Sequence, residues 1–328
     1  MALILKRNRR ASAMRVLVTD SIAQEGIDLL RSHLPDAQID VRLDLTAEQL
    51  QTVICQYMAL IVRSETRVTS DILAAATHLK IVGRAGVGLD NIDTEAAKRY
   101  GIAVVNSLWG NTIAAAQHTI ALLLSLAWHI PAANSSTRAG RWEKSYFLGV
   151  QVRNKVLGIL GLGKVGKEVA RCAQGLGMQV IAFDPYVAPE QVEKLGVTML
   201  DMEDVLKLAD FVTLHTTLTN GTRGLVGAYE LSLLKPGARL INCARGGLID
   251  EEALLHALKE NRLVGVALDV FSQEPIRDDA VLQQLLADPR VIATPHLGAS
   301  TQEAQVQVAI DVAEQIVSFL RDSVLYAA

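Results

Sequence analysis

The chain has 328 residues, half of them hydrophobic and 20% charged, which is enough apolar sequence for about two domains with cores of their own. Its net charge of −3 gives no indication of a nucleic-acid partner, and no apolar run approaches the ~20 residues that span a bilayer. Three widely spaced cysteines, Cys55, Cys172 and Cys243, indicate a reducing compartment, the cytoplasm, with neither a disulfide framework nor a metal site.

The chain begins with a basic segment. Five basic residues precede the first acidic residue, Asp20: Lys6, Arg7, Arg9, Arg10 and Arg15. The apolar part, residues 2–5, is too short for a secretory signal. We interpret residues 1–14 as a basic tail, with a transit peptide as the alternative.

Strand and helix patterns alternate from residue 15 to residue 105. Strands are expected at residues 15–19, 39–43, 59–62, 80–82 and 103–105. Helices are expected at residues 22–33, 46–56, 70–76 and 94–100, the second with a capping box of Thr46 and Gln49. This alternation predicts a parallel, doubly wound sheet with helices on both faces.

A long and very apolar helix is expected over residues 111–130, because neither Pro nor Gly interrupts the pattern before Pro131. The sharpest domain boundary lies just before it, near Leu108. Residues 132–153 are expected to be irregular. Because a helix this apolar would leave a large exposed patch on a monomer, it favours a homodimer.

A glycine-rich turn organises the second half of the chain. The apolar residues 157–160 run into Gly161-Leu-Gly163-Lys164-Val165-Gly166, and a helix follows directly. The first glycine permits the tight turn, the second a close approach of pyrophosphate, and the third close packing of helix on strand. A second strand, residues 178–183, ends at Asp184, about 20 residues on, where such folds place the ribose-binding carboxylate. The turn therefore predicts a dinucleotide site, and the carboxylate favours NAD over NADP.

Further strands are expected at residues 211–216, 238–242, 264–270 and 291–295. A last helix, residues 301–320, is expected to begin at a capping box of Ser300 and Glu303. Since the second sheet is complete before it, this helix is expected to return to the first domain. We thus expect one domain of residues 1–109 and 297–328 and an inserted domain of residues 110–296, with ligands in a cleft between them.

Three polar segments follow the later strands. They place Arg245, then Asp269 and Glu274, then His296 at strand ends. An arginine, a carboxylate and a histidine suit the interconversion of 2-oxo and 2-hydroxy acids. The forked guanidinium binds the substrate carboxylate and polarises its carbonyl. The histidine moves the proton, and the carboxylate holds the imidazolium.

On these residues the chain resembles the D-isomer-specific 2-hydroxyacid dehydrogenase family. Similar segments include residues 60–66, 83–93 and 106–112 as well as the three above. The resemblance implies an NAD-binding Rossmann domain inserted into a flavodoxin-like substrate domain. It places Arg245, Glu274 and His296 at the family's catalytic positions and gives Asp269 a contact with the nicotinamide carboxamide.

The resemblance also assigns binding residues. Cofactor contacts are implied for the turn residues Gly161, Gly163, Lys164, Val165 and Gly166, for Asp184, and for His215, Cys243, Ala244, Asp269, His296 and Gly298. Substrate contacts are implied for Arg63, Ser64, Arg84, Val87, Gly88, Asn111, Arg245 and His296. A nucleophilic role for Cys243 is not expected, and His215 is interpreted as structural. His118, one turn into the long helix, is interpreted as a packing residue, with a place facing the cleft as the alternative.

The chain is most similar to the branch of the family that oxidises 3-phosphoglycerate to 3-phosphohydroxypyruvate with NAD. A hydroxypyruvate or glyoxylate reductase remains an alternative, as does a non-catalytic NADH-sensing scaffold of the same fold. Three positions depart from the family pattern: Leu108, Trp109 and Gln117. Because many members of this branch carry further C-terminal domains, a short or truncated form is expected.

Overall fold

The computed structural model of the chain describes residues 14–188, 192 and 194–325. Except for Met14, the predicted basic tail lies outside the described residues. The chain divides into two compact units. Unit 1 combines the residues up to Asn111 with those from Ser300, and unit 2 is Thr112–Ala299. The sequence placed these divisions after residues 109 and 296.

Unit 1 is built on a five-stranded parallel sheet in the order β2-β1-β3-β4-β5. Its strands are β1 (Arg15–Val18), β2 (Gln38–Val41), β3 (Ala59–Val62), β4 (Ile81–Arg84) and β5 (Ala103–Asn106). This is the order of flavodoxin-like sheets. The predicted fold of this part is confirmed.

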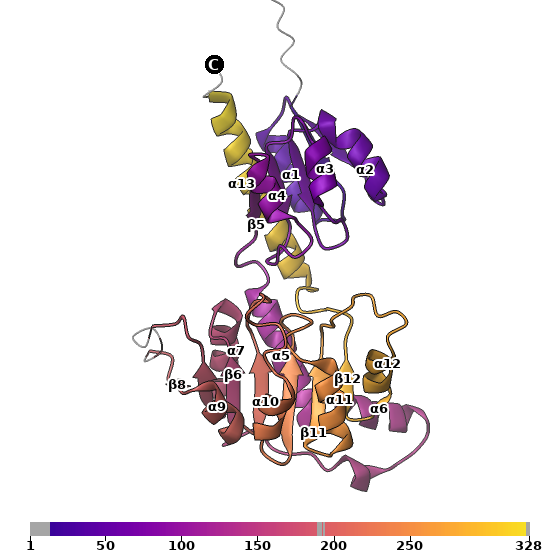
Figure 1. Ribbon diagram of the computed structural model, residues 1–328, viewed down its shortest axis with the longest axis vertical. Helices are drawn as coiled ribbons and strands as arrows, with labels where there is room; N and C mark the ends of the chain where they lie inside the picture. The colour runs from indigo at the N-terminus through magenta and orange to yellow at the C-terminus, as the bar shows by residue number, and fades with distance from the viewer. Residues whose placement is uncertain (1–13, 189–191, 193, 326–328) are drawn as a thin grey trace, which may run out of the picture. The chain divides into compact units, whose positions relative to one another are not determined.

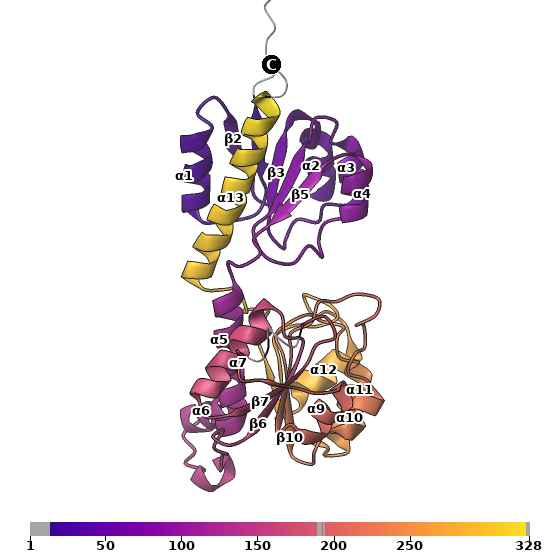
Figure 2. The ribbon, with the colours of Figure 1, turned by 90° about the vertical axis from the view of Figure 1, so that its left-hand side faces the viewer.

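Helices cover both faces of this sheet, as Figure 2 shows. They are α1 (Gln24–His33), α2 (Ala47–Val53), the 3₁₀ helix η1 (Ile54–Gln56), α3 (Ser70–Ala75), α4 (Thr94–Arg99) and α13 (Gln302–Leu325). Alternation along β1 sets the layers: Val16 and Val18 pack with α1 and α13, whereas Leu17 packs with α2, α3 and α4. A Cβ atom at Gly26 of α1 would lie 2.8 Å from the Cβ of Ala309, so glycine permits the close packing of α1 on α13.

Unit 2 contains a seven-stranded parallel sheet in the order β12-β11-β10-β9-β6-β7-β8. The strands, shown in the lower part of Figure 1, are β6 (Val156–Leu160), β7 (Gln179–Phe183), β8 (Thr198–Met199), β9 (Phe211–Leu214), β10 (Ala238–Asn242), β11 (Leu263–Leu268) and β12 (Val291–Ala293). The chain turns back at β6, which has β7 on one side and β9 on the other. This is the Rossmann order with one strand added, and it confirms the predicted fold of this part.

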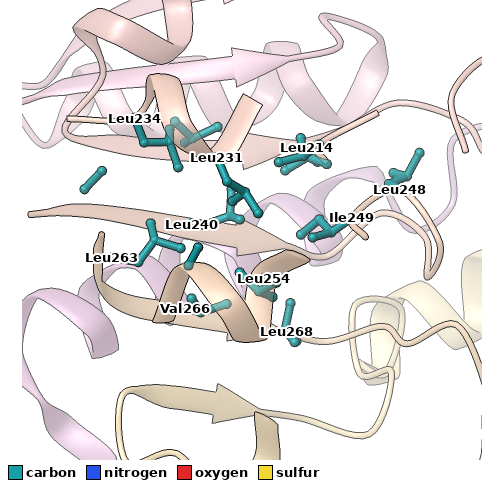
Figure 3. Packing of buried hydrophobic residues seen from close by; sticks show 14 of the residues in the cluster. Leu214, Leu231, Leu234, Leu240, Leu248, Ile249, Leu254, Leu263, Val266 and Leu268 are labelled. Atoms are coloured by element: carbon teal, nitrogen blue, oxygen red, sulfur yellow. The ribbon is translucent and has the colours of Figure 1, made fainter. Parts of the chain in front are cut away.

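Helices lie on both faces of this sheet as well. They are α5 (Thr112–Trp128), α6 (Ile130–Arg138), the 3₁₀ helix η2 (Lys144–Phe147), α7 (Lys164–Gly175), α9 (Met202–Leu208), α10 (Ala228–Leu233), α11 (Glu251–Lys259) and α12 (Ala280–Ala287). One core lies between the sheet and α5 and α7. The other joins the sheet to α9, α10, α11 and α12; Figure 3 shows part of it, with Leu240 and Val266 among its residues.

Two predictions for residues 111–153 were wrong. The long helix ends at Trp128, and His129 then adopts a left-handed conformation, with φ of 53°. A second helix, α6, begins at Ile130, with Pro131 in its first turn, where the missing N–H has no intrahelical partner in any case. Pro131 therefore marks the start of a helix, and residues 132–138, expected to be irregular, are helical.

The predicted start of the last helix was also wrong. The cap contact comes from Thr301, whose Oγ1 accepts the N–H of Ala304 at 3.2 Å. The predicted capping box at Thr46 and Gln49 is confirmed in α2. Among the described residues, no single helix is long and apolar enough to cross a membrane; α5 and α6 meet that criterion only as a pair, and they are bent by 63°.

Candidate active site

The glycine-rich turn joins β6 to α7 as the sequence predicted. Gly161 has φ of 97°, which L-residues rarely adopt, and its N–H donates to the carbonyl of Phe183 at 2.9 Å. A Cβ atom at Gly166 would lie 2.2 Å from the carbonyl oxygen of Gly161, so only glycine lets α7 start this close to the strand. A Cβ atom at Gly163 would meet nothing within 4 Å. The turn thus leaves open the position through which a phosphate would approach the helix N-terminus.

Asp184 follows β7 and bonds to this turn. Its Oδ2 accepts the N–H of Leu162 at 2.7 Å, and its Oδ1 accepts the N–H of Tyr186 at 2.9 Å. The carboxylate therefore braces the backbone of the glycine turn. Two further turn residues are predicted to contact the cofactor. Lys164 is half-buried, and Val165 packs against the core that lies between the sheet and helices α5 and α7.

The end of β9 places two polar side chains beside the turn. Burial lowers the pKa of His215 to about 3, and its Nε2 lies 3.0 Å from the Oγ1 of Thr213. Its imidazole is therefore neutral at physiological pH. Its neighbour Thr216 was not singled out from the sequence, where threonine carries no particular signal. The buried Oγ1 of Thr216 has no hydrogen-bond partner, and its Cγ2 would lie 2.8 Å from a Cβ atom on Gly161. Such a buried hydroxyl beside the open turn fits a site that binds a polar ligand.

Asn242, at the end of β10, shapes the turn that carries Arg245. Its Oδ1 accepts the N–H of Ala244 at 3.0 Å, and its Nδ2 donates to the carbonyl of Arg245 at 2.9 Å. The guanidinium of Arg245 donates from Nη1 to the carbonyl of Ala244 at 2.7 Å. Burial raises the pKa of Cys243 to about 12, so this side chain is a neutral thiol. This agrees with the expectation that Cys243 is not a nucleophile.

The loops after β10 and β11 pack closely together. A Cβ atom at Gly246 would lie 1.7 Å from the carbonyl oxygen of Phe271, so glycine is required at this contact. The N–H of Phe271 in turn donates to Oε1 of Glu274 at 2.9 Å. The turn of Arg245 and the loop of Glu274 are therefore built against one another.

Glu274 and His296 form a hydrogen-bonded pair. Oε2 of Glu274 lies 2.6 Å from Nδ1 of His296, and both side chains are partly exposed. Burial raises the pKa of Glu274, but the bonds from His296 and from the N–H of Phe271 outweigh it, so its pKa lies below the ordinary value. The carboxylate is thus ionised at neutral pH. Because it engages Nδ1, Nε2 is the nitrogen available for proton exchange.

Asp269, at the end of β11, organises the loop that carries His296. Its side chain is fully buried. Oδ1 accepts the hydroxyl of Thr294 at 2.5 Å and the N–H of Leu297 at 2.8 Å, and Oδ2 accepts the N–H of Gly298 at 2.9 Å. His118 of α5 also reaches Oδ1, with Nε2 at 3.1 Å. Beyond the position of His118 near the start of the helix, no signal in the sequence pointed to this contact.

The residues assigned to substrate in unit 1 follow two neighbouring strands. Arg63 and Ser64 follow β3, and the loop of residues 84–88 follows β4, whose Arg84 pairs with Val62 of β3. In that loop, the carbonyl of Val87 accepts from Nδ2 of Asn106 at 2.5 Å. Gly88 is half-buried, as is Asn111, the last residue of unit 1 before α5.

Two side chains shape the loop after β3. Oδ2 of Asp20 accepts the N–H groups of Arg63 and Thr66 at 2.6 and 3.1 Å, and Oδ1 accepts the hydroxyl of Thr66. Nδ2 of Asn91 donates to the carbonyls of the same two residues, each at 2.7 Å. Asp20 itself is buried. The loop is therefore held from both sides, while Ser64 within it is exposed.

Unit 2 thus brings most of the predicted cofactor and catalytic residues to the carboxyl ends of adjacent parallel strands. The glycine turn, His215, Arg245, Glu274 and His296 follow β6, β9, β10, β11 and β12, which are neighbours in the sheet. In open α/β sheets, ligands bind at this edge, where the strand order reverses. Among residues 14–188, 192 and 194–325, no three His, Cys, Asp or Glu side chains gather as a metal site would require.

Comparison with known proteins agrees with this arrangement. The sequence profile of the D-isomer specific 2-hydroxyacid dehydrogenase NAD-binding domain matches residues 120–298. The chain belongs to this family, and unit 2 is its NAD-binding domain. The glycine turn, the open position at Gly163 and the unpartnered hydroxyl of Thr216 all fit that cofactor.

Among its relatives, the chain is 49% identical over 308 residues to D-3-phosphoglycerate dehydrogenase of Synechocystis sp., and 44% identical over 316 residues to that of Bacillus subtilis. These alignments cover 94% of this chain but 54% and 57% of the relatives, so the chain spans about half the length of the curated relatives it matches.

Solved structures match over nearly their full length. The TT0316 protein from Thermus thermophilus superposes with a TM-score of 0.86 at 33% identity, over 94% of this chain and 97% of that one. D-Lactate dehydrogenase from Aquifex aeolicus, solved with NAD and lactic acid, gives 0.84 at 25% identity, over 94% and 96%.

Proposed function

We propose that the chain is an NAD-dependent dehydrogenase that oxidises 3-phosphoglycerate to 3-phosphohydroxypyruvate, the first step of serine biosynthesis. The observation that carries the chemistry is the hydrogen bond between His296 and Glu274 at 2.6 Å, in the same unit as Arg245 and the glycine turn. The choice of substrate rests on the names of relatives that are 42–49% identical over most of this chain.

His296 is the acid–base group of this reaction. In oxidation, Nε2 takes the hydroxyl proton of the 2-hydroxy acid, while Glu274 holds Nδ1 and stabilises the resulting imidazolium. In reduction the same nitrogen returns the proton to the carbonyl oxygen. Bound NAD supplies the acceptor for the hydride that leaves C2.

Arg245 binds and polarises the substrate. Its guanidinium presents forked donors that match a carboxylate and reach the neighbouring carbonyl oxygen. The bond from Nη1 to the carbonyl of Ala244 and the bonds of Asn242 to the turn fix the position of the Arg245 side chain. For unit 1, we propose substrate contacts for Arg63 and Ser64 and for the residues 84–88 and Asn111, as the family resemblance implies.

Asp184 is proposed to select NAD over NADP. Its carboxylate is fixed by the N–H groups of Leu162 and Tyr186, beside the glycine turn. A negative charge held there accepts hydrogen bonds from ribose hydroxyls and repels a 2′-phosphate. Equal rates with both cofactors would contradict this assignment.

We also propose that the chain forms a homodimer, but on grounds other than the apolar composition of the long helix. α5 is largely buried within unit 2, with Leu122, Leu123 and Leu126 in its core, so this helix leaves no large apolar face. Large exposed apolar side chains lie instead at the last residue of this helix and in the segment that follows it. This apolar surface of unit 2 comprises Trp128, Ile130, Trp142, Tyr146 and Leu148, which are 51–86% exposed. Exposed apolar side chains of this size support the proposed interface.

A substrate panel tests the activity. Purified protein with NADH is offered phosphohydroxypyruvate, hydroxypyruvate, glyoxylate and pyruvate, and the fall in NADH absorbance is followed. We expect the phosphorylated substrate to give the highest kcat/KM, and His296→Ala to reduce its turnover by roughly 10²–10⁴-fold. A preference for an unphosphorylated 2-oxo acid would identify a reductase of the same chemistry. NADH binding without turnover of any substrate would indicate a sensing scaffold and refute the proposed function.

A further inference from the structure

His118 is a titratable residue near the site to which the reaction above gives no role. It lies on α5, and its side chain is 19% exposed. Its Nε2 is 3.1 Å from Oδ1 of Asp269 and 3.2 Å from Oγ1 of Thr294. These two residues lie 151 and 176 positions further along the chain, at the ends of β11 and β12.

Asp269 connects His118 to the catalytic loop. Its carboxylate accepts bonds from Thr294, from the N–H of Leu297 and from the N–H of Gly298, and its own carbonyl accepts the N–H of His296 at 2.9 Å. This one aspartate therefore fixes the backbone on both sides of His296.

The backbone of His296 needs this support. Its φ of 54° lies in the left-handed region, which is strained for a residue other than glycine. A residue persists there only where the surrounding structure determines its conformation. The same loop must also keep Nδ1 of His296 within reach of Glu274.

Asp269 needs a partner as well. A fully buried carboxylate is costly unless hydrogen bonds or an opposite charge compensate it. Burial raises the pKa of Asp269, but the bonds from His118 and Thr294 outweigh it, and the pKa falls below its ordinary value. Of these two donors, only His118 comes from outside the catalytic loops.

We propose that His118 is a positioning residue: by donating from Nε2 to Asp269 it holds residues 294–298 so that His296 meets Glu274. The proposal deepens the dehydrogenase function proposed above and rests on it for its kinetic test. The competing explanation is that His118 merely fills space between α5 and the sheet.

Two substitutions separate these explanations. His118→Leu keeps an apolar volume and removes the donor, whereas His118→Gln places an amide N–H close to the position of Nε2. His256→Leu is the matched control, because His256 also faces a carboxylate in unit 2, that of Glu260 at 3.7 Å, but on the exposed surface of α11.

Three readouts are taken for each variant: kcat with the preferred 2-oxo acid, NADH affinity by fluorescence, and hydrogen exchange of the peptide that contains residues 294–298. We expect His118→Leu to lower kcat by about 10–100-fold, the range that displaced catalytic groups cost, with NADH affinity changed less than about threefold. Exchange at Leu297 and Gly298 should accelerate in this variant. His118→Gln should restore most of the rate and the protection, and His256→Leu should match wild type.

Wild-type exchange in His118→Leu would overturn the proposal whatever the kinetics show, and so would equal impairment in His118→Leu and His118→Gln. If His118→Leu does not fold, His118→Asn, whose amide is too short to reach Asp269, takes its place. If the wild-type protein turns over no substrate but His118→Leu still accelerates exchange, the positioning role of His118 is supported and the proposed dehydrogenase function is refuted. Failure of one proposal can therefore be told from failure of the other.

Discussion

The hydrogen-bonded pair of Glu274 and His296 makes a quantitative prediction about turnover. Glu274→Gln keeps the size and the hydrogen-bonding capacity of the side chain and removes its charge, which lies against Nδ1 of His296 at 2.6 Å. In oxidation the imidazole gains a positive charge as it takes the hydroxyl proton, and the carboxylate stabilises that charge. Without the carboxylate charge, kcat for oxidation should therefore fall.

The structure sets the size of this loss. Two unit charges about 4 Å apart interact by about 1 kcal/mol in water and about 4 kcal/mol at an effective dielectric constant of 20. The side chains of His296 and Glu274 are 48% and 34% exposed, so water screens the pair and the lower part of that range applies. At about 1.36 kcal/mol for each factor of ten in rate, the expected loss of kcat is about tenfold.

The assay is steady-state kcat for oxidation, with NADH affinity measured beside it and expected to stay at the wild-type value. Glu203→Gln, which removes the carboxylate paired with Lys207 on the surface of α9, is the control and should keep the wild-type kcat. Wild-type kcat in Glu274→Gln, or an equal loss in Glu203→Gln, would refute a role of the Glu274 charge in the reaction.

Other predictions concern binding, assembly and stability. Gly163→Ala should keep the wild-type melting temperature but weaken NADH binding at least tenfold, since the added methyl group meets no protein atom and occupies the open side of the turn. Gly161→Ala should instead destabilise the fold by about 1–2 kcal/mol or more. Its φ of 97° disfavours any L-residue, and the new Cβ atom would lie 2.8 Å from the backbone of His215. Thermal unfolding and fluorescence titration distinguish the two, and equal loss of stability would be inconsistent with this interpretation. Leu148→Asp, on the exposed apolar surface of unit 2, should shift the mass in light scattering from dimer to monomer; a monomeric wild type at micromolar concentration would contradict the homodimer. Because the pKa of Asp269 is lower in the folded protein than in the unfolded chain, its contribution to stability is present above about pH 4 and is lost as the pH falls through the folded value. Denaturant titrations between about pH 5 and 3 should thus show a shallower loss for Asp269→Asn than for wild type, and parallel curves would refute the ionised state.

The sequence predicted those features that local rules determine. The glycine turn could be predicted because each glycine meets a backbone requirement that no other residue meets. The two sheets could be predicted because apolar strands alternate with amphipathic helices. Where two residues satisfy the same rule, the sequence did not decide: Ser300 and Thr301 both suit an N-cap, and the structure uses Thr301. Pro131 is compatible with the end of one helix and with the first turn of the next.

Contacts between distant residues were not predictable in this way. His118 and Asp269 are 151 positions apart, and their pairing depends on how α5 packs against the carboxyl ends of β11 and β12. The unpartnered hydroxyl of Thr216 likewise has no sequence signature, because it depends on what surrounds the side chain. The apolar composition of α5 indicated burial but not against what, and the structure places that burial within unit 2.

The loop after β3 has a consequence for how such a protein diverges. Asp20 and Asn91, which determine the path of its backbone, stand 43 or more and 25 or more positions away from the residues they hold. They bond to main-chain groups and to Thr66, and Ser64 and Glu65 take no part in this bonding. Substitutions at positions 64 and 65 therefore leave intact the hydrogen bonds that hold the backbone of this loop. The path of this loop and the proposed substrate contact at Ser64 therefore depend on separate residues.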